Sequence, residues 1–268
     1  MAPLPSTRVK SRDAEIVYWS LGDGPPVVLL HPFPANHTFW LPVAEELSTR
    51  FRVLLPDLRG HGDSDAGEGA ATMGKHAADL ARVMDDAGIG RAPIIGVSIG
   101  GYILFEFWRS YRSRVVALGL CNTKAPADNA EGRAARLQAA NDVLERGTEA
   151  FFHSMIPRLL GKTTRENRPD MIDDALRMMD KMSPQDVAQV QRGMAERPDS
   201  VETLKTINVP TLIVTGDEDP MTGVSEASLM QEHIPQSELR VIPRAGHYSP
   251  WEQSREFSKL LRQFLERL

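Results

Sequence analysis

The chain has 268 residues and a formal net charge of −5 with acidic and basic residues mixed throughout, which argues against nucleic acid or an anionic membrane as the main partner. Cys121 is the only cysteine, so an intramolecular disulfide and a zinc cluster of cysteines are excluded, and a reducing compartment fits best. Since no apolar run approaches the roughly 20 residues that span a bilayer and the first residues lack a leader pattern, we expect a cytoplasmic protein.

The first elements in chain order are two short strands, expected at 7–11 and 14–20, followed by a buried strand at 27–30. This third run is apolar on both faces, which is typical of a central strand in a parallel sheet. The same kind of run returns at 53–55, 94–95, 115–120 and 211–214, and helical periods lie at 38–49, 75–88 and 99–111. The alternation of strand and helix predicts an α/β fold with right-handed crossovers.

The alternation stops between residues 122 and 207, where the chain contains no buried-strand run. Four amphipathic stripes occupy this segment and predict about four helices. The stripes are Leu137, Ala140 and Leu144; Phe151, Phe152, Met155, Ile156 and Leu159; Ile172, Ala175, Leu176 and Met179; and Val187, Val190 and Met194. We therefore expect a core in two parts, 1–122 and 207–268, with an all-helical cap over 123–206. A closing helix is expected at 252–267.

Ser98 stands between glycines in the segment Ile94–Gly101, where an apolar run changes into a helical pattern. A strand that turns sharply into a helix exposes such a serine in a strained position, and the glycines avoid collisions in the turn. This pattern predicts a nucleophile elbow, and the alternative is a glycine-rich turn with an incidental serine. Because serine is a weak nucleophile at neutral pH, the interpretation requires a histidine base and an acid.

His247 is the candidate base, because it follows the last short apolar run and a glycine and comes last in the expected order of nucleophile, acid and histidine. Most other histidines are expected to be ordinary core or surface residues. Three carboxylates compete for the acid on the loop after the strand at 211–214. We choose Asp219, because an acid three residues past the glycine projects back toward the histidine loop, and Asp217 is the alternative.

Two backbone N–H groups are candidates for binding the oxyanion of an acyl-transfer transition state. One belongs to Ile99, directly after the proposed nucleophile. The other belongs to Phe33, because Pro32 and Pro34 on either side of it have no N–H to donate. The alternative for this second segment is a rigid proline turn that happens to carry an aromatic residue.

The segment from Asp57 to Ser64 is dense in charge and glycine, and we expect a structural loop at the carboxyl edge of the sheet. Its histidine spacing does not match a zinc site on one helix face, and no phosphate-binding loop pattern occurs. The sequence therefore predicts no metal site.

Taken together, four motifs resemble the α/β-hydrolase superfamily, over residues 8 to 265. They are Gly96–Gly100, Asp57–Gly62, Gly216–Asp219 and Ala245–His247. The resemblance implies an eight-stranded, mostly parallel sheet with flanking helices, a helical cap over the active site, a triad of Ser98, Asp219 and His247, and no cofactor. Pro32 stands where the family's oxyanion segment usually has glycine. Within the superfamily the chain is most similar to the branch of 3-oxoadipate enol-lactonases and carboxylesterases.

The expected function is that of a serine hydrolase that cleaves small carboxylic esters or lactones through an acyl-enzyme on Ser98. Alternatives with the same triad are a cofactor-free perhydrolase or haloperoxidase, a thioesterase and a carbon–carbon hydrolase. A small-molecule receptor on this fold is the alternative from another class. The expected partner is a small-molecule substrate, and the sequence leaves the oligomeric state open.

The candidates for substrate contact are aromatic and sulfur side chains of the core and the expected cap. They are Trp40, Phe151, Phe152 and Met155. The alternative for each of them is packing within the protein's own core. Arg133 and Arg136 lie on the first expected cap helix, where a solvated helix face is the main interpretation and contact with an anionic lactone is the alternative.

Overall fold

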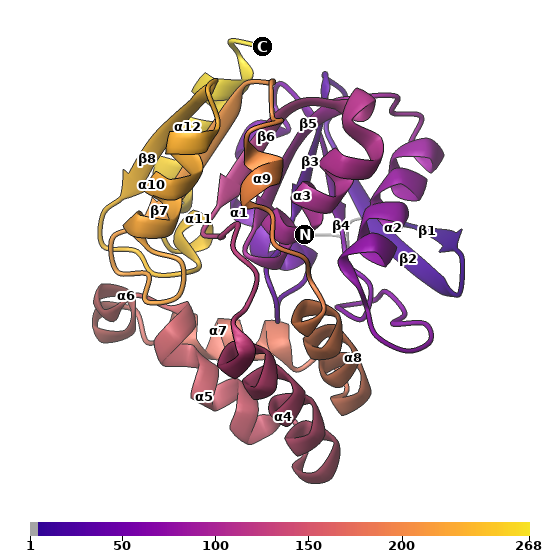
Figure 1. Cartoon of the computed structure of the whole chain (residues 1–268). Helices are drawn as coiled ribbons and strands as arrows, with labels where there is room; N and C mark the ends of the chain where they lie inside the picture. The colour runs from indigo at the N-terminus through magenta and orange to yellow at the C-terminus, as the bar shows by residue number, and fades with distance from the viewer. Residues whose placement is uncertain (1–4) are drawn as a thin grey trace.

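The computed structural model describes residues 5–268, and these form an eight-stranded sheet flanked by helices (Figure 1). The strands are β1 (Ser6–Ser11), β2 (Ala14–Leu21), β3 (Pro26–Leu30), β4 (Arg52–Pro56), β5 (Ala92–Val97), β6 (Val115–Cys121), β7 (Thr211–Gly216) and β8 (Ser237–Ile242). Their order in the sheet is β1-β2-β4-β3-β5-β6-β7-β8. β2 pairs antiparallel with β1 and β4, and every other pairing is parallel. The predicted mostly parallel sheet is therefore confirmed.

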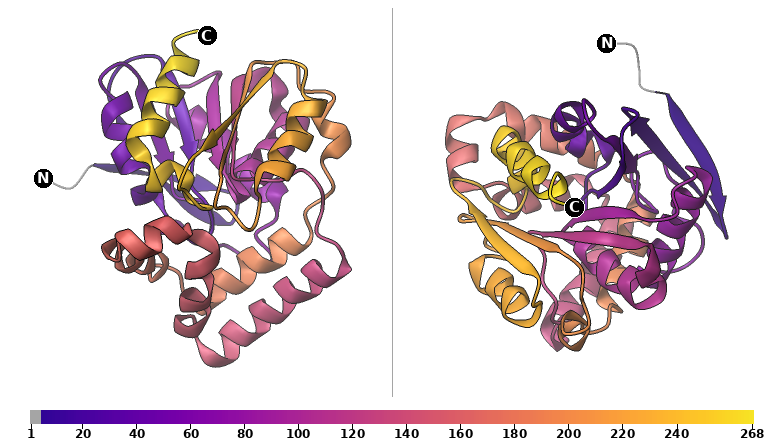
Figure 2. Two further views of the ribbon diagram at one scale, coloured as in Figure 1. Left: turned by 90° about the vertical axis from the view of Figure 1, so that its left-hand side faces the viewer. Right: turned by 90° about the horizontal axis from the view of Figure 1, so that it is seen from above.

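Helices cover both faces of this sheet. The helices beside the sheet are α1 (Leu41–Leu47), α2 (Met73–Asp86), α3 (Ile99–Tyr111), α10 (Val224–His233), α11 (Ser249–Glu252) and α12 (Ser254–Leu265), with short 3-10 turns at η1 (His37–Trp40) and η2 (Arg112–Arg114). The short helix α9 (Val201–Leu204), which falls within the expected cap range, contacts α3 and α10. α1 packs with α12 on one face, whereas α3 and α10 lie on the other (Figure 2). Because both faces are covered, Val27, Val28, Leu29 and Leu30 of β3 are fully buried.

Five helices follow β6 and lie beyond one end of the sheet (Figure 1). They are α4 (Ala130–Arg146), α5 (Glu149–Leu159), α6 (Lys162–Asn167), α7 (Asp170–Met179) and α8 (Pro184–Ala195). Four of them occupy the positions of the predicted stripes. The sequence analysis missed α6, because the six residues KTTREN carry no apolar stripe. The division into two core parts and a cap stays a prediction.

Two predicted helices differ in detail from those in the structure. The helix expected at 38–49 begins as the turn η1, whose start is capped by Asn36, and continues as α1. The closing helix expected at 252–267 corresponds to α12, which begins at Ser254, because the backbone of Gln253, with φ −122° and ψ 51°, is not helical and separates it from the short helix α11. In both places a local backbone change interrupts an otherwise continuous apolar pattern.

The charged segment after β4 finds its partners inside the protein. The guanidinium of Arg59 is buried and pairs with Asp79 and Asp13, each at 2.8 Å. Asp57 is also buried and accepts hydrogen bonds from the backbone N–H groups of His37 at 2.6 Å and Asp63 at 2.8 Å. These contacts fasten the loop to its neighbours, as a structural role requires.

None of the helices in the described part of the chain combines the length and apolarity needed to cross a bilayer. The expected location in the cytoplasm stays a prediction.

Candidate active site

Ser98 lies at the sharp turn between β5 and α3. Its backbone has φ 56° and ψ −111°, a conformation that residues other than glycine rarely adopt. The N–H of Ser98 donates to the carbonyl of Cys121 at 3.0 Å, and the carbonyl of Ser98 accepts from Gly101 at 2.9 Å. Strain of this kind costs about 1–3 kcal/mol and persists only where the surroundings hold it. The turn has the strand–helix geometry that the sequence pattern requires.

The glycines beside Ser98 allow the strand and helix to come close together. A Cβ on Gly96 would lie 2.5 Å from the carbonyl carbon of Gly100, and a Cβ on Gly100 would lie 2.9 Å from the carbonyl oxygen of Leu30. Both contacts are with backbone atoms, which cannot rotate away. Any larger side chain at these positions would therefore push α3 off the sheet.

His247 and Asp219 are in direct contact. The Nδ1 atom of His247 donates to Oδ2 of Asp219 at 2.9 Å, and both side chains are buried. The hydroxyl of Thr222 and the amide of Asn122 also donate to Oδ2, at 2.8 and 2.9 Å. The backbone N–H groups of Met221 and Thr222 donate to Oδ1 at 2.8 and 3.1 Å. This network fixes the carboxylate and, through it, the orientation of the imidazole.

These contacts keep Asp219 ionised. Burial alone would raise the pKa of Asp219, because it disfavours the charged form. The charge of His247 and the hydrogen bonds from His247, Asn122 and Met221 act in the other direction and hold the pKa well below its usual range. The carboxylate is therefore negative at neutral pH and favours the tautomer of His247 that carries its proton on Nδ1.

The Nε2 atom of His247 is buried and has no hydrogen-bond partner among residues 5–268. It is the acceptor atom in the tautomer that Asp219 selects. His247 and Ser98 line the same cavity, although no hydrogen bond joins the two side chains. Catalytic hydrogen bonds are often long before substrate binds, so this arrangement is compatible with proton transfer from Ser98.

The other two carboxylates of the loop after β7 face elsewhere. Asp217 is exposed and accepts a long hydrogen bond of 3.4 Å from the N–H of Ala245. Glu218 accepts from the N–H of Thr163 at 2.8 Å and so ties the loop to the start of α6. Neither carboxylate contacts His247, and of the three only Asp219 meets the geometric requirement for the acid.

Two N–H groups, that of Ile99 next to Ser98 in the chain and that of the cavity residue Phe33, have no hydrogen-bond partner in the described part of the chain. Ile99 is the first residue of α3, and its N–H makes no hydrogen bond. Phe33 lies in a turn in which the N–H of Ala35 donates to the carbonyl of Pro32 at 3.0 Å, and the N–H of Phe33 is likewise unused. Both remain available to an oxyanion, so their role stays a prediction.

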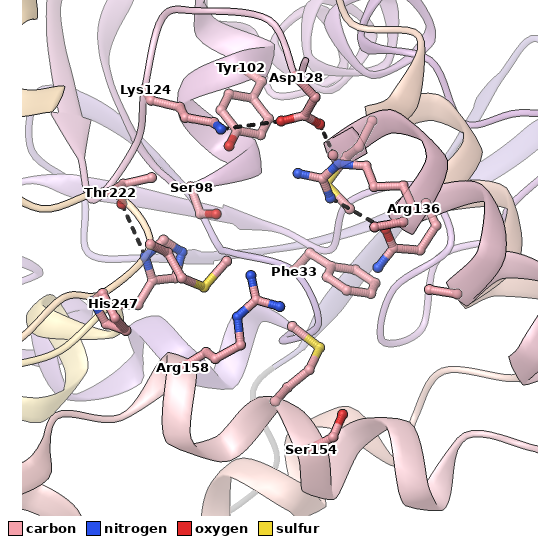
Figure 3. Close-up of a pocket in the computed structure, with 18 of the residues that line it drawn as sticks. Phe33, Ser98, Tyr102, Lys124, Asp128, Arg136, Ser154, Arg158, Thr222 and His247 are labelled. Atoms are coloured by element: carbon pink, nitrogen blue, oxygen red, sulfur yellow. Dashed lines mark hydrogen bonds and ion pairs between the residues drawn. The ribbon is translucent and has the colours of Figure 1, made fainter. Parts of the chain in front are cut away.

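The cavity has a volume of about 350 Å³ and lies between the carboxyl ends of the strands and helices α4, α5 and α8 (Figure 3). Its lining consists of Phe33, Ser98, Tyr102, Lys124, Asp128, Gly132, Ala135, Arg136, Ala139, Phe151, Ser154, Met155, Arg158, Gln191, Met194, Pro220, Met221, Thr222 and His247. This volume falls near the lower end of the range for small-molecule sites.

The structure brings two of the four predicted contact residues, Phe151 and Met155, to the cavity wall. Trp40 does not reach it, because its ring is fully buried against Phe39 and Phe257 in the core. Phe152 is not part of the lining either, since its side chain is buried with its ring centre 5.9 Å from that of Phe151. An amphipathic stripe shows that these residues are buried, but not which of them face a ligand.

Several cavity residues were not predicted, and they are mostly polar. Thr222 contacts both Asp219 and His247, and Lys124, Asp128 and Arg158 place charges in the wall. A signal for Arg158 was present in the sequence. It follows Phe151 by seven residues and Met155 by three, so it shares their helix face.

A serine in a strained turn at the carboxyl end of a mostly parallel sheet, and a histidine bound to an aspartate beside the same cavity, are features found in hydrolases. The chain belongs to the alpha/beta hydrolase fold family, whose model matches residues 25–254.

Similar proteins include esterases and lactonases. The chain is 27% identical to a protein of Acinetobacter baylyi named 3-oxoadipate enol-lactonase 1, covering 91% of this chain and 90% of that one. A malate-bound thermophilic esterase from Thermogutta terrifontis is 37% identical, with a TM-score of 0.95 and 98% of each chain covered. An enol-lactonase from Burkholderia xenovorans is 25% identical, with a TM-score of 0.90, and covers 97% of this chain and 100% of that one. These likenesses confirm the predicted resemblance and support hydrolysis of esters or lactones at the level of the family.

Proposed function

We propose that the protein is a serine hydrolase of small carboxylic esters or lactones, with Ser98 as nucleophile, His247 as base and Asp219 as the acid that orients it. The observation that carries this proposal is the set of contacts around His247. One ring nitrogen is bound to a buried carboxylate, while the other has no partner in residues 5–268 and borders the cavity that Ser98 lines. This is the constellation that activates a hydroxyl in acyl-transfer enzymes.

In the first half of the reaction, His247 Nε2 takes the proton of Ser98 as Oγ attacks the substrate carbonyl. The N–H groups of Ile99 and Phe33 bind the oxyanion, each contributing a few kcal/mol to the transition state. When the carbonyl re-forms, the bond to the leaving oxygen breaks, and His247 returns the proton to that oxygen. The product of this half is an alcohol and an acyl group on Ser98. A lactone gives the same ester, with its hydroxyl still attached to the acyl group.

In the second half, His247 takes a proton from water, and the resulting hydroxide adds to the acyl carbonyl. Collapse of this adduct breaks the bond to Oγ, and the proton returns to Ser98. Asp219 keeps the imidazole in one tautomer and stabilises its charged form in both halves. We further propose that helices α4 to α8 serve as the cap that limits the size of the substrate. The cavity volume of about 350 Å³ favours small acyl groups.

The test is a panel of 4-nitrophenyl esters and simple lactones assayed with the wild-type protein and two variants. Ser98→Ala should lower kcat by about 10³-fold or more, because it removes the nucleophile. Ser154→Ala is the matched control, since Ser154 lines the same cavity and its hydroxyl is bound to the carbonyl of Phe151 at 2.7 Å. Activity that survives Ser98→Ala, or equal losses in the two variants, would count against the proposal.

A further inference from the structure

The cavity wall carries positive charge, although the chain as a whole is acidic. Its side chains include three cations, Lys124, Arg136 and Arg158, and one carboxylate, Asp128. The formal net charge of the chain is −5, so this excess of cations is a local property of the site. A cleft lined by one sign of charge concentrates ligands of the opposite sign.

Two of these cations already have a protein partner. Lys124 lies 3.2 Å from Oδ1 of Asp128, and Nε of Arg136 lies 2.5 Å from its Oδ2. A third cation outside the lining, Arg197, binds the same carboxylate at 2.9 Å. Asp128 is thus surrounded by three cations. Its single negative charge is shared among these three cations and does not neutralise Arg158.

Arg158 is the cation of this wall that has neither an ion pair nor a hydrogen bond within residues 5–268. It lies in the last turn of α5, on the helix face that also presents Phe151, Ser154 and Met155 to the cavity. In Figure 3 its side chain extends from α5 into the pocket that Ser98, Phe33 and His247 also line. A guanidinium in this position offers two parallel N–H donors, which match the geometry of a carboxylate.

We propose that Arg158 is a specificity-determining residue that binds a carboxylate of the substrate while the scissile carbonyl lies at Ser98. The preferred substrates are therefore half-esters of short dicarboxylic acids. This inference rests on the proposed function, because it assumes that the bond is cleaved at Ser98. It adds the charge of the substrate and the residue that selects it.

The test compares two substrates of equal chain length, the mono-4-nitrophenyl ester of adipic acid and 4-nitrophenyl hexanoate. The wild type should favour the anionic ester. Arg158→Gln should lower kcat/KM for this ester about tenfold, mainly through a higher KM, and change kcat/KM for the hexanoate by less than about twofold. Arg158→Lys should recover part of the loss, because it restores the charge without the planar fork.

Arg133→Gln is the matched control. Arg133 is an exposed arginine of α4 that does not line the cavity, so its substitution removes the same charge without touching the site. It should leave both substrates unaffected. Equal losses on the two esters in Arg158→Gln, or a wild type without preference for the anion, would overturn the inference.

A binding experiment separates this inference from the proposed function. Adipate itself should raise the Tm of Ser98→Ala but not that of the double variant Ser98→Ala/Arg158→Gln, because binding to the folded state stabilises it. If adipate binds in this way and no ester is cleaved, the proposed function fails and the carboxylate site stands. If esters are cleaved and adipate has no effect, only the inference about Arg158 fails.

Discussion

At the scale of single residues, the loop after β7 shows how neighbours decide the role of a carboxylate. Asp217 and Asp219 are two residues apart, yet Asp217 is exposed, whereas the buried carboxylate of Asp219 accepts five hydrogen bonds. The loop turns after Gly216, and this turn carries the side chain of Asp219 back toward His247. The chemical difference between the two acids is therefore one of position, since their intrinsic properties are the same.

This difference yields a prediction with an internal control. Asp219→Asn should lower kcat about 10³- to 10⁴-fold, because an amide can hold the wrong tautomer of His247 and leaves the imidazolium unstabilised. Asp217→Asn should change kcat by less than about twofold. Steady-state kinetics on one good ester, with circular dichroism to check folding, provides the measurement. If the larger loss fell on Asp217, the assignment of the acid would be wrong.

The sequence was sufficient to predict the positions of residues that are fixed by their neighbours along the chain. Ser98 could be predicted because its turn requires glycines at fixed spacing, and the choice of Asp219 followed from its distance along the chain from Gly216. Thr222, Asp128 and Arg158 were missed because their places depend on how the helices pack over the strands. Trp40 was expected at the site as one of the aromatic candidates, but its side chain is buried in the core, which was the stated alternative.

At the scale of elements, α8 approaches the core at a single glycine. A Cβ on Gly193 would lie 1.9 Å from the carbonyl oxygen of Ala71, and the N–H of Ala71 donates to the carbonyl of Gln189 at 3.0 Å. This close backbone contact positions α8, which together with α4 and α5 lines the cavity. The position of α8 therefore depends on the absence of a side chain at Gly193.

Gly193→Ala should destabilise the protein by about 1–3 kcal/mol, because the new methyl group meets backbone that must move. Gly90→Ala is the control, since nothing lies within 4 Å of a Cβ at that position. It should be neutral or slightly stabilising. Urea denaturation of both variants gives the free energies of unfolding. Equal stability of the two variants would show that α8 can shift without cost.

Most elements could be predicted from periodicity, because the buried strands are continuous apolar runs and the long helices carry apolar stripes. Short or weakly patterned helices were missed, and α6 is one example, because it is short and polar. It is held by contacts from distant segments, among them the bond from the N–H of Thr163 to Glu218. Local sequence contains no information about such partners.

At the scale of the whole molecule, three buried histidines link stability to pH. Burial lowers the pKa of His31 and His76 well below the usual value, and it lowers the pKa of His61 to about 4. All three are therefore neutral in the folded protein near neutral pH. In the unfolded chain each takes up a proton below about pH 6.5.

The protein should consequently lose stability as the pH falls from about 6.5 toward 4, because the unfolded state binds more protons than the folded state. At pH 5 the loss reaches about 2 kcal/mol for a histidine that stays neutral in the folded protein. His76 is a suitable test, since neither ring nitrogen has a partner in the described chain. His76→Leu should reduce the loss between pH 7 and pH 5 in urea titrations, by up to about 2 kcal/mol. The exposed His153→Leu should not, and an unchanged slope in His76→Leu would refute the linkage.

The central claim is that Ser98 carries the acyl group during turnover, and acid quench followed by intact-mass and peptide analysis tests it most directly. With 4-nitrophenyl butyrate as substrate, the wild type should gain the mass of one butyryl group on the peptide that contains Ser98, and Ser98→Ala should gain none. A wild-type protein that turns over the ester without any adduct, or an adduct on another residue, would contradict the account.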